Sequence, residues 1–193
     1  MRTLIVATQN PGKLKEMQHY LTGLPWQLQL MPPELEIEET GETFLANACL
    51  KASQVAQRTG QWAIADDSGL EVEALEGAPG IYSARYGKTD AERIQRLLDA
   101  LGRELNRAAQ FSCVIALARP DGSIACHAKG SCPGEILRAG RGEGGFGYDP
   151  IFYVPTEGKT FAELPSDIKR RLSHRGVAFQ ALLPQLRPFQ TDS

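Results

Sequence analysis

The fold is organised around residues 62 to 70, which read Trp62-Ala63-Ile64-Ala65-Asp66-Asp67-Ser68-Gly69-Leu70. Residues 62–65 have the apolar composition and the length of a short buried strand. We expect this strand to end where Asp66, Asp67 and Ser68 enter a turn at Gly69. Adjacent carboxylates repel each other unless a cation lies between them, so this pair is a candidate for binding a hard divalent ion or for accepting a proton from water. An ordinary turn that closes a strand has the same composition, and other stretches must decide.

The chain has 193 residues, 42% of them hydrophobic, and a formal net charge of −2. This size suits one large domain or two joined lobes, and because no repeat or low-complexity linker interrupts the chain, we predict a single domain over residues 1–193. The small net charge argues against a broad nucleic-acid surface, although a small polyanion needs only a few lysines or arginines. No stretch approaches the roughly 20 apolar residues that cross a membrane, and Met1 leads directly into a predicted strand. We therefore expect a cytoplasmic protein that binds neither nucleic acid nor a membrane.

The four cysteines are Cys49, Cys113, Cys126 and Cys132, and no two of them form a C-x-x-C pair. Each lies in an apolar or turn-like segment. This pattern favours reduced thiols over a disulfide framework or a zinc site.

The N-terminal segment predicts a buried strand over residues 2–7, followed by a helix. Asn10 is a good N-cap and Pro11 suits the first helical position. The helix N-terminus and the Lys13 ammonium would present donors to an anion such as a phosphate. This is not a Walker A loop, since Leu14 stands where the metal-binding Ser or Thr would follow the lysine. Phosphate binding and an ordinary capped helix both stay open on local grounds.

An acidic loop separates the next two predicted elements. Residues 26–30 alternate apolar and polar side chains and predict a half-exposed strand beside the first. Five glutamates then crowd into residues 34–42, where either solvent or a metal must relieve their repulsion. A helix is predicted over residues 43–58, with Gly60 as its stop signal. Lys51 lies about two turns into this helix and is expected to point back toward the acids.

The later elements follow from the same signals. A helix is predicted to begin at Thr89 and to end at Gly102, followed by strands over 111–118 and 123–128 that are joined by a turn at Pro120-Asp121-Gly122. A strand over 151–154 and a polar helix containing Lys169 come next. The last helix is predicted to be capped by Ser173 and ended or kinked by Pro184, with a frayed tail after Pro188.

Residues 134–150 are rich in glycine and predict a loop that builds a pocket. Phe146 and Tyr148 offer faces on which a base could stack, and Asp149 could accept from ring N–H groups. A tight loop with packed aromatics is the alternative. His174 and Arg175 fall in the first turn of the last helix, an unfavourable place for cations unless an anion or a carbonyl oxygen faces them.

Taken together, the motifs resemble the inosine and xanthosine triphosphatases of Ham1 type, from about residue 3 to about residue 183. The matching motifs are Thr8-x-Asn10-x-x-Lys13, Glu38-Glu39-Thr40-Gly41, Asn47-Ala48 to Lys51-Ala52, Ala65 to Leu70, Gly77 to Tyr86, Gly144 to Pro150, and Ser173-His174-Arg175. The resemblance implies an elongated, two-lobed α/β fold around a mixed central sheet, an active-site cleft between the lobes, a homodimer and Mg²⁺. It also implies hydrolysis of ITP, dITP or XTP to the monophosphate and pyrophosphate, which removes these non-standard purine nucleotides from the pool.

The resemblance also assigns roles. Asp67 corresponds to the proton acceptor and to a metal ligand, and Glu38 to the second metal ligand, with Glu39 and Asp66 as helpers. The residues that correspond to substrate-binding positions around the phosphates are Thr8, Gln9, Asn10, Pro11, Gly12, Lys13, Lys51 and Ser68. Gln9 stands where many members of the family carry glycine.

A second set corresponds to the base pocket and comprises Phe146, Gly147, Tyr148, Asp149, Lys169, His174 and Arg175. A 6-oxo purine has an acceptor where adenine has an amino donor. Donors from Lys169, His174 or Arg175 would therefore favour hypoxanthine and xanthine over adenine.

Two other functions stay open. One is a nucleotide-binding protein without catalysis, which would require the acid set to be broken, whereas Glu38 and Asp67 are both present. The other is a pyrophosphatase for modified pyrimidine nucleotides, which would share the metal chemistry and differ in the base pocket. Base preference separates the second from the purine enzyme.

Overall fold

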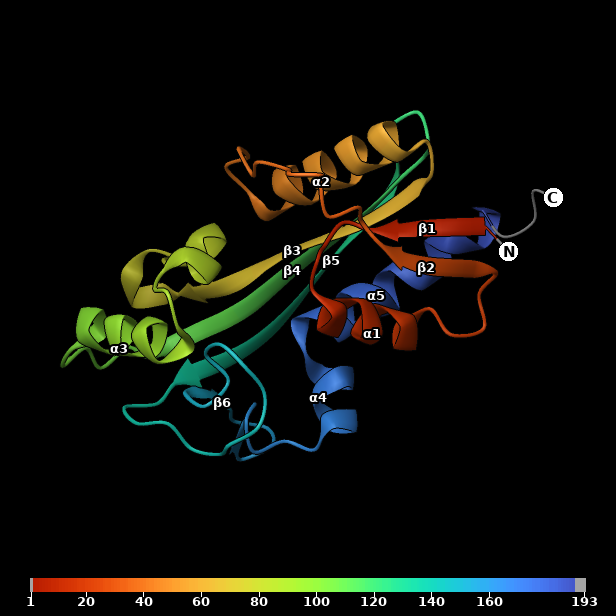
Figure 1. The fold of residues 1–193 in the computed structure, drawn as a ribbon. Helices are drawn as coiled ribbons and strands as arrows, with labels where there is room; N and C mark the ends of the chain where they lie inside the picture. Colours follow the sequence, from red (N-terminus) through yellow and green to blue (C-terminus); the bar gives the residue numbers. More distant parts are fainter. Residues whose placement is uncertain (1, 190–193) are drawn as a thin grey trace. The chain divides into compact units, whose positions relative to one another are not determined.

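A seven-stranded sheet with the order β2-β1-β3-β4-β5-β6-β7 is the framework of the computed structural model, which describes residues 2–189 (Figure 1). Its strands are β1 (Arg2–Val6), β2 (Trp26–Leu30), β3 (Trp62–Val72), β4 (Ala108–Ala118), β5 (Ile124–Ile136), β6 (Phe152–Val154) and β7 (Lys159–Thr160). β1 pairs in parallel with β2 and β3, whereas β6 pairs antiparallel with β5 and β7. The predicted α/β class with a mixed sheet is therefore confirmed.

Five α-helices and three short 3₁₀ helices connect the strands within the described residues. They are α1 (Pro11–Tyr20), α2 (Phe44–Thr59), η1 (Glu73–Leu75), η2 (Gly80–Arg85), α3 (Asp90–Leu101), α4 (Ser166–Leu172), α5 (His174–Leu186) and η3 (Arg187–Phe189). No helix among them is long and apolar enough to cross a membrane.

The chain forms two compact units, each assembled from separate segments. Unit 1 comprises residues 1–67, 113–130 and 178–193, and unit 2 comprises residues 68–112 and 131–177. The chain passes from unit 1 to unit 2 within β3, after Asp67.

The core of unit 1 lies where α1 and α5 cover β1. Leu4 and Val6 project from the same face of β1 and pack with Met17 of α1 and Phe179 of α5. All four side chains are at most 1% exposed. Figure 1 shows α2 on the other side of β1 from α1. The buried side of α2 carries fully buried small side chains such as Ala52, which let a helix approach a sheet closely.

The core of unit 2 contains a cluster of aromatic rings. Phe111 of β4 lies edge-on to Phe152 of β6, with ring centroids 4.6 Å apart, and stacks on Phe161 at 5.7 Å. Leu97 and Leu101 of α3 belong to the same buried cluster. The apolar periodicity that predicted α3 therefore marks its packed face.

The predicted helix ends are confirmed because their signals are local. Asn10 caps α1 by accepting a hydrogen bond from the Gly12 amide at 2.8 Å. Thr43 caps α2 through Ala46, and Gly60 ends it in the left-handed conformation at φ 64°. For α3, Thr89 is the N-cap and Gly102 the C-cap, as predicted.

The prediction that the central strand ends at Ala65 is wrong. β3 continues to Val72, so that Asp66, Asp67, Ser68 and Gly69 lie within the strand. Gly69 is required by a close approach instead of a turn, because a Cβ at this position would lie 2.2 Å from the Gly80 carbonyl oxygen. Pairing with neighbouring strands keeps this polar segment extended, and the local composition of the segment does not predict that pairing.

Other boundaries moved less. β4 and β5 are longer than predicted, and residues 134–136 of the glycine-rich stretch belong to β5. Ser173 caps α5 as predicted, since its Oγ accepts from the Gly176 amide at 3.2 Å. Pro184 does not end α5, which continues to Leu186. Most of the predicted frayed tail, residues 190–193, lies outside the described residues. Cys49, Cys113, Cys126 and Cys132 are not in disulfides in the described structure, where reduced thiols were predicted.

Candidate active site

Side-chain hydrogen bonds hold the turn that leads into α1 in unit 1. Thr8 Oγ1 accepts from the Asn10 amide at 3.1 Å, and Asn10 in turn caps α1 at its first residues, Pro11 and Gly12. The Lys13 ammonium lies 3.1 Å from Asp66 Oδ1. Thr8, Asn10 and Lys13 are among the residues that the family resemblance assigns to phosphate binding. The structure brings Lys13 to Asp66, one of the two adjacent acids of β3.

Gln9 is exposed and points away from this turn. Its side-chain amide donates to the Pro33 carbonyl at 2.9 Å, at the start of the acidic loop. Gln9 therefore ties the turn after β1 to that loop in this structure.

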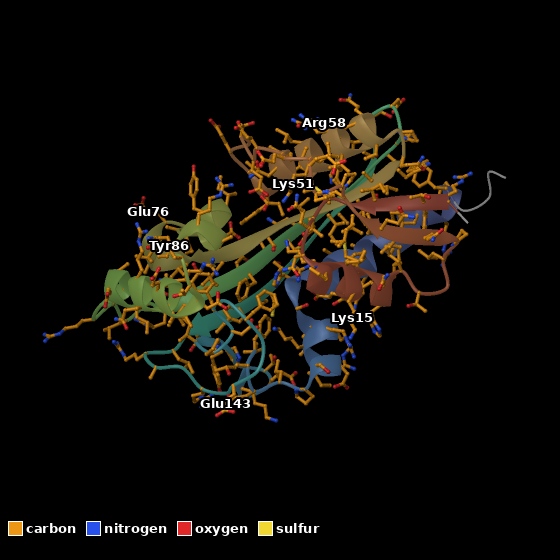
Figure 2. The ribbon with its side chains drawn as sticks, viewed as in Figure 1. Lys15, Lys51, Arg58, Glu76, Tyr86 and Glu143 are labelled. Carbon is orange, nitrogen blue, oxygen red and sulfur yellow. The ribbon has the colours of Figure 1, made fainter. Side chains whose placement is uncertain are left out.

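Lys51 of α2 joins the acidic loop to the second central acid. Its ammonium lies 2.6 Å from Glu39 Oε1 and 3.7 Å from Asp67 Oδ1, and its side chain is only 11% exposed. The expectation that Lys51 points back toward the acids is confirmed. Figure 2 labels Lys51 on α2.

Asp66 and Asp67 each meet a different lysine. Successive side chains of an extended strand project to opposite faces, and the two acids are consecutive residues of β3. Asp66 accordingly pairs with Lys13 of α1, and Asp67 with Lys51 of α2. The charge of Asp66 also attracts Lys51, so this lysine interacts with both acids.

Burial raises the pKa of Asp67 above its ordinary value, and the charge of Lys51 opposes this shift without cancelling it. The charges of Glu39 and Asp66 raise the pKa of Asp67 further, while a hydrogen bond from Asn47 lowers it. For Lys51, burial lowers the pKa, but the attraction of Asp66, Asp67 and Glu39 outweighs burial and the net shift is upward. Asp67 is thus a more basic carboxylate than usual, and Lys51 is firmly charged.

The predicted metal ligand Glu38 is exposed, and its neighbour Glu39 makes the contact with Lys51. Among residues 2–189, no three side chains of His, Cys, Asp or Glu are grouped closely enough to hold a metal ion. In this conformation the helper Glu39, instead of Glu38, is the loop acid held beside Asp67.

Asn47 is a site residue to which the sequence reasoning gave no role. It is 1% exposed, accepts from the Gly41 amide at 2.8 Å and hydrogen-bonds to Asp67. One signal could have found it: Asn47 follows Phe44 by three positions and therefore lies on the apolar face of a helix. A polar side chain on that face needs partners.

A second group of predicted residues meets in unit 2 around Asp149. The Lys169 ammonium hydrogen-bonds to Asp149 Oδ2, which also accepts from the Phe146 amide at 2.7 Å. The Lys169 Nζ lies 5.1 Å from the centroid of the Phe146 ring, which is 65% exposed. Burial raises the pKa of Asp149, and Lys169 opposes the shift. An exposed aromatic face beside a held ion pair can stack a base and read its edge.

Gly147 and Tyr148, also predicted to bind substrate, have internal partners. The Gly147 amide donates to Asp90 Oδ2 at 2.7 Å, and the buried Tyr148 hydroxyl donates to the Ser83 carbonyl at 2.9 Å. These contacts hold the loop around Phe146 in place. The alternative of a tight loop with packed aromatics therefore holds for Gly147 and Tyr148, whereas Phe146 is exposed.

His174 and Arg175 have separate surroundings within unit 2. The His174 ring stacks on Phe111, with centroids 4.8 Å apart. The buried guanidinium of Arg175 lies 3.5 Å from Ser68 Oγ, a residue assigned to the phosphates. The structure therefore brings Lys169, Asp149 and Phe146 together, and places Arg175 beside Ser68.

Comparisons with known proteins agree with these motifs. The model of the Ham1 family matches residues 4–185. A "dITP/XTP pyrophosphatase" of Nostoc sp. is 64% identical over 192 residues, covering 100% of this chain and 98% of the relative. A protein of the same description from Synechocystis sp. is 61% identical and covers 100% of both chains.

Solved structures show the same likeness. The Ham1 protein of Staphylococcus aureus superposes with a TM-score of 0.90 at 42% identity, covering 97% of this chain and 100% of that protein. A HAM1 protein from Coxiella burnetii also has a TM-score of 0.90, at 46% identity and the same coverage. With a family match over most of its length and relatives of this identity, the chain belongs to the Ham1 family.

Proposed function

We propose that this protein hydrolyses dITP, XTP and ITP to the monophosphate and pyrophosphate, and so removes these nucleotides from the pool. The observation that carries the proposal is the environment of Asp67, a buried carboxylate with a raised pKa that is held by Lys51 and Asn47. Relatives that are 64% and 61% identical are named dITP/XTP pyrophosphatases, which supports this substrate class.

Asp67 is proposed as the general base. A base works best when its pKa lies nearer to the working pH, and burial moves the pKa of Asp67 in that direction. In the proposed step, Asp67 takes a proton from water while the water oxygen bonds to the α-phosphorus. The bond from the α-phosphorus to the bridging oxygen breaks, and pyrophosphate leaves with that oxygen.

Lys13, Lys51 and the N-terminus of α1 are proposed to hold the phosphates. Both lysines are paired with acids, and a triphosphate would offer them stronger partners. Their charges would stabilise the negative charge that moves onto the leaving pyrophosphate. Thr8 and Asn10 shape the turn from which these donors project.

The acids around Asp67 fit Mg²⁺ by their chemistry. Magnesium prefers oxygen ligands, and the charges of Glu39 and Asp66 already raise the pKa of Asp67, a repulsion that a divalent cation would relieve. We propose Asp67 and Glu38 as the ligands, with Glu39 as the alternative because it lies beside Lys51. Bound magnesium would offset phosphate charge and orient the attacking water.

The base is proposed to bind in unit 2. Phe146 would stack on the purine, and Lys169, supported by Asp149, would donate to the 6-oxo group. Adenine has an amino donor at that position and would face donor against donor. The relatives named dITP/XTP pyrophosphatases favour a purine enzyme over one for modified pyrimidines.

The test uses the purified protein with magnesium and, in parallel, XTP, dITP, ITP, GTP, ATP and dCTP. We expect hydrolysis of the first three to exceed that of ATP and dCTP, with one pyrophosphate released per monophosphate. In ¹⁸O-labelled water the label should appear in the monophosphate. Release of orthophosphate, a preference for the pyrimidine nucleotide, or activity unchanged by EDTA would each contradict the proposal.

We further propose that the protein acts as a homodimer in the cytoplasm, as the family resemblance implies. Light scattering after gel filtration tests the first statement. A molar mass near that of the 21.1 kDa chain, instead of twice that value, would contradict it.

A further inference from the structure

Asn47 is a buried amide within the helix that carries Lys51. It is 1% exposed, and a buried polar side chain is stable only when its donors and acceptors are satisfied. Its Oδ1 accepts from the Gly41 amide at 2.8 Å. Its side chain also hydrogen-bonds to Asp67, and because a carboxylate accepts, the amide nitrogen is the donor in this contact. One side chain thus joins the backbone of the acidic loop to the proposed base.

The loop is pressed against α2 at this point. A Cβ on Gly41 would lie 2.7 Å from Asn47 Oδ1 and 2.8 Å from Ala46 Cβ, so the backbone passes too close for any larger residue. Gly41 follows Glu39 by two positions in the chain. The contact with Asn47 therefore sets where the end of the acid-bearing segment lies.

Lys51, one turn later in α2, also contacts the acidic loop and Asp67, but its partner in the loop is Glu39. Residues four apart lie on one face of a helix, and Lys51 contacts both Glu39 and Asp67. An ion pair tolerates a range of distances and directions, whereas an amide with both ends bonded imposes a defined geometry. Asn47 and Lys51 consequently have different tasks: the lysine supplies charge, and the amide supplies position.

The loop has other attachments that allow a comparison. The Arg58 guanidinium, at the other end of α2, donates to the Glu36 carbonyl at 3.1 Å, and Figure 2 labels this exposed residue. Arg58 thus holds the loop at a different point, through Glu36. It therefore separates a general tether of the loop from the specific link through Asn47.

We propose that Asn47 is a positioning residue, which ties Asp67 to the backbone of the acidic loop so that Asp67 and the loop carboxylates act as one unit toward the cation and the attacking water. This inference rests on the proposed function for its catalytic part. Asn47 would touch neither the substrate nor the cation, and would act through Asp67 and Gly41.

The test compares the wild type with Asn47→Asp, Asn47→Ala and the control Arg58→Ala. Asn47→Asp keeps an acceptor for the Gly41 amide and removes the donor to Asp67, whereas Asn47→Ala removes both. Partners that orient a metal-binding or catalytic group typically contribute roughly 10- to 100-fold to activity or metal affinity. We expect both Asn47 variants to lose kcat for XTP by about this factor, with KM within about threefold, and Arg58→Ala to change kcat by less than about twofold. Melting temperatures and circular dichroism establish that each variant is folded.

A second readout does not depend on turnover. Mn²⁺ binding to the nucleotide-free protein, measured by calorimetry, should weaken roughly 10-fold in Asn47→Ala and stay unchanged in Arg58→Ala. Wild-type kcat in Asn47→Asp would overturn the role of the link to Asp67, and equal losses in Asn47→Ala and Arg58→Ala would reduce Asn47 to an ordinary tether. If the wild type hydrolyses none of the nucleotides, the proposed function fails, and the Mn²⁺ comparison alone decides: equal affinity in wild type and Asn47→Ala would then overturn the inference.

Discussion

The Lys51 ammonium lies 2.6 Å from Glu39 Oε1, so the buried cation of α2 is paired with the acidic loop. A cation and a triphosphate would each need one partner of this pair. The acid would bind the cation and the lysine would bind the phosphates, so each ligand would release the partner that the other requires. The two ligands are therefore expected to bind cooperatively.

Replacing Lys51 by methionine tests this relationship. Without the competing ammonium, Mn²⁺ should bind more tightly to the nucleotide-free protein, since Glu39 and Asp67 lose a positively charged partner. The KM for XTP should rise by about 10- to 150-fold, because a hydrogen bond to a charged group contributes about 1.5–3 kcal/mol. Lys15→Met, an exposed change on α1 labelled in Figure 2, is the control and should alter neither value. Weaker Mn²⁺ binding in Lys51→Met would show that the lysine supports the cation site.

Asp67→Asn should keep the fold and nucleotide binding but lose turnover by about 10²- to 10⁴-fold, the usual contribution of a positioned general base. The amide cannot accept a proton from water, and it is a weaker ligand for a hard cation. Pyrophosphate release measures the effect. Asp121→Asn makes the same chemical change in the exposed turn between β4 and β5 and should leave turnover unchanged. Near wild-type turnover in Asp67→Asn would refute the role of Asp67.

The same variant should be more stable than the wild type at neutral pH. Burial raises the folded-state pKa of Asp67 above its unfolded value of 3.8, so its ionised form is disfavoured in the folded protein. The wild type is thus penalised above the folded pKa and regains stability as pH falls toward 3.8. The Tm advantage of Asp67→Asn should accordingly be largest near pH 7 and vanish below about pH 4, as measured by calorimetry in EDTA.

Asp121→Asn is the control of opposite sign for this experiment. Hydrogen bonds from Ser123 lower the pKa of Asp121, so the variant should be slightly less stable at neutral pH, and the difference should fade as the carboxylate protonates. A Tm gain in Asp67→Asn that is independent of pH would have to come from packing instead of ionisation.

Phe146→Ala should weaken substrate binding with little effect on stability. The ring is 65% exposed and buries little apolar surface, so Tm should hardly change. Stacking of a base on an aromatic ring contributes about 1–3 kcal/mol, which predicts a rise in KM for XTP of about 5- to 150-fold. Leu105→Ala, which removes an 85% exposed side chain in the same unit, should leave KM unchanged. An unchanged KM in Phe146→Ala would place the base elsewhere.

Arg175→Ala distinguishes two assignments of its guanidinium. If Arg175 donates to the 6-oxo group, the ratio of kcat/KM for ITP to that for ATP should fall by about 10- to 150-fold, since only the 6-oxo purine loses a charge-assisted hydrogen bond. If it acts beside Ser68, which lies 3.5 Å away, both nucleotides should lose equally. Because the family resemblance assigns Arg175 to the base pocket, where it would donate to the 6-oxo group together with Lys169, we predict the fall in the ratio. An equal loss would move Arg175 to the phosphates. The exposed Arg171→Ala is the control.

The sequence by itself determined the elements whose causes are local. Asn10 with Pro11, and Thr43 with Gly60, define the ends of α1 and α2 through backbone hydrogen bonds and φ preferences within a few residues. The place of Lys51 about two turns into the helix that follows the acids also indicated that it points back toward them. The family motifs assigned the residues of the candidate site, because each motif is a set of residue types at fixed spacing within a short stretch.

The tertiary structure alone decided which of these residues meet. Strand neighbours keep β3 extended through Asp66 and Asp67, where Lys13 pairs with Asp66 and Lys51 interacts with both acids. The contacts of Asn47 with Gly41 and Asp67, and of Arg175 with Ser68, join residues whose encounter depends on how helices and loops pack. Local propensity carries no information on such contacts, since their energy exists only once distant segments have been brought together.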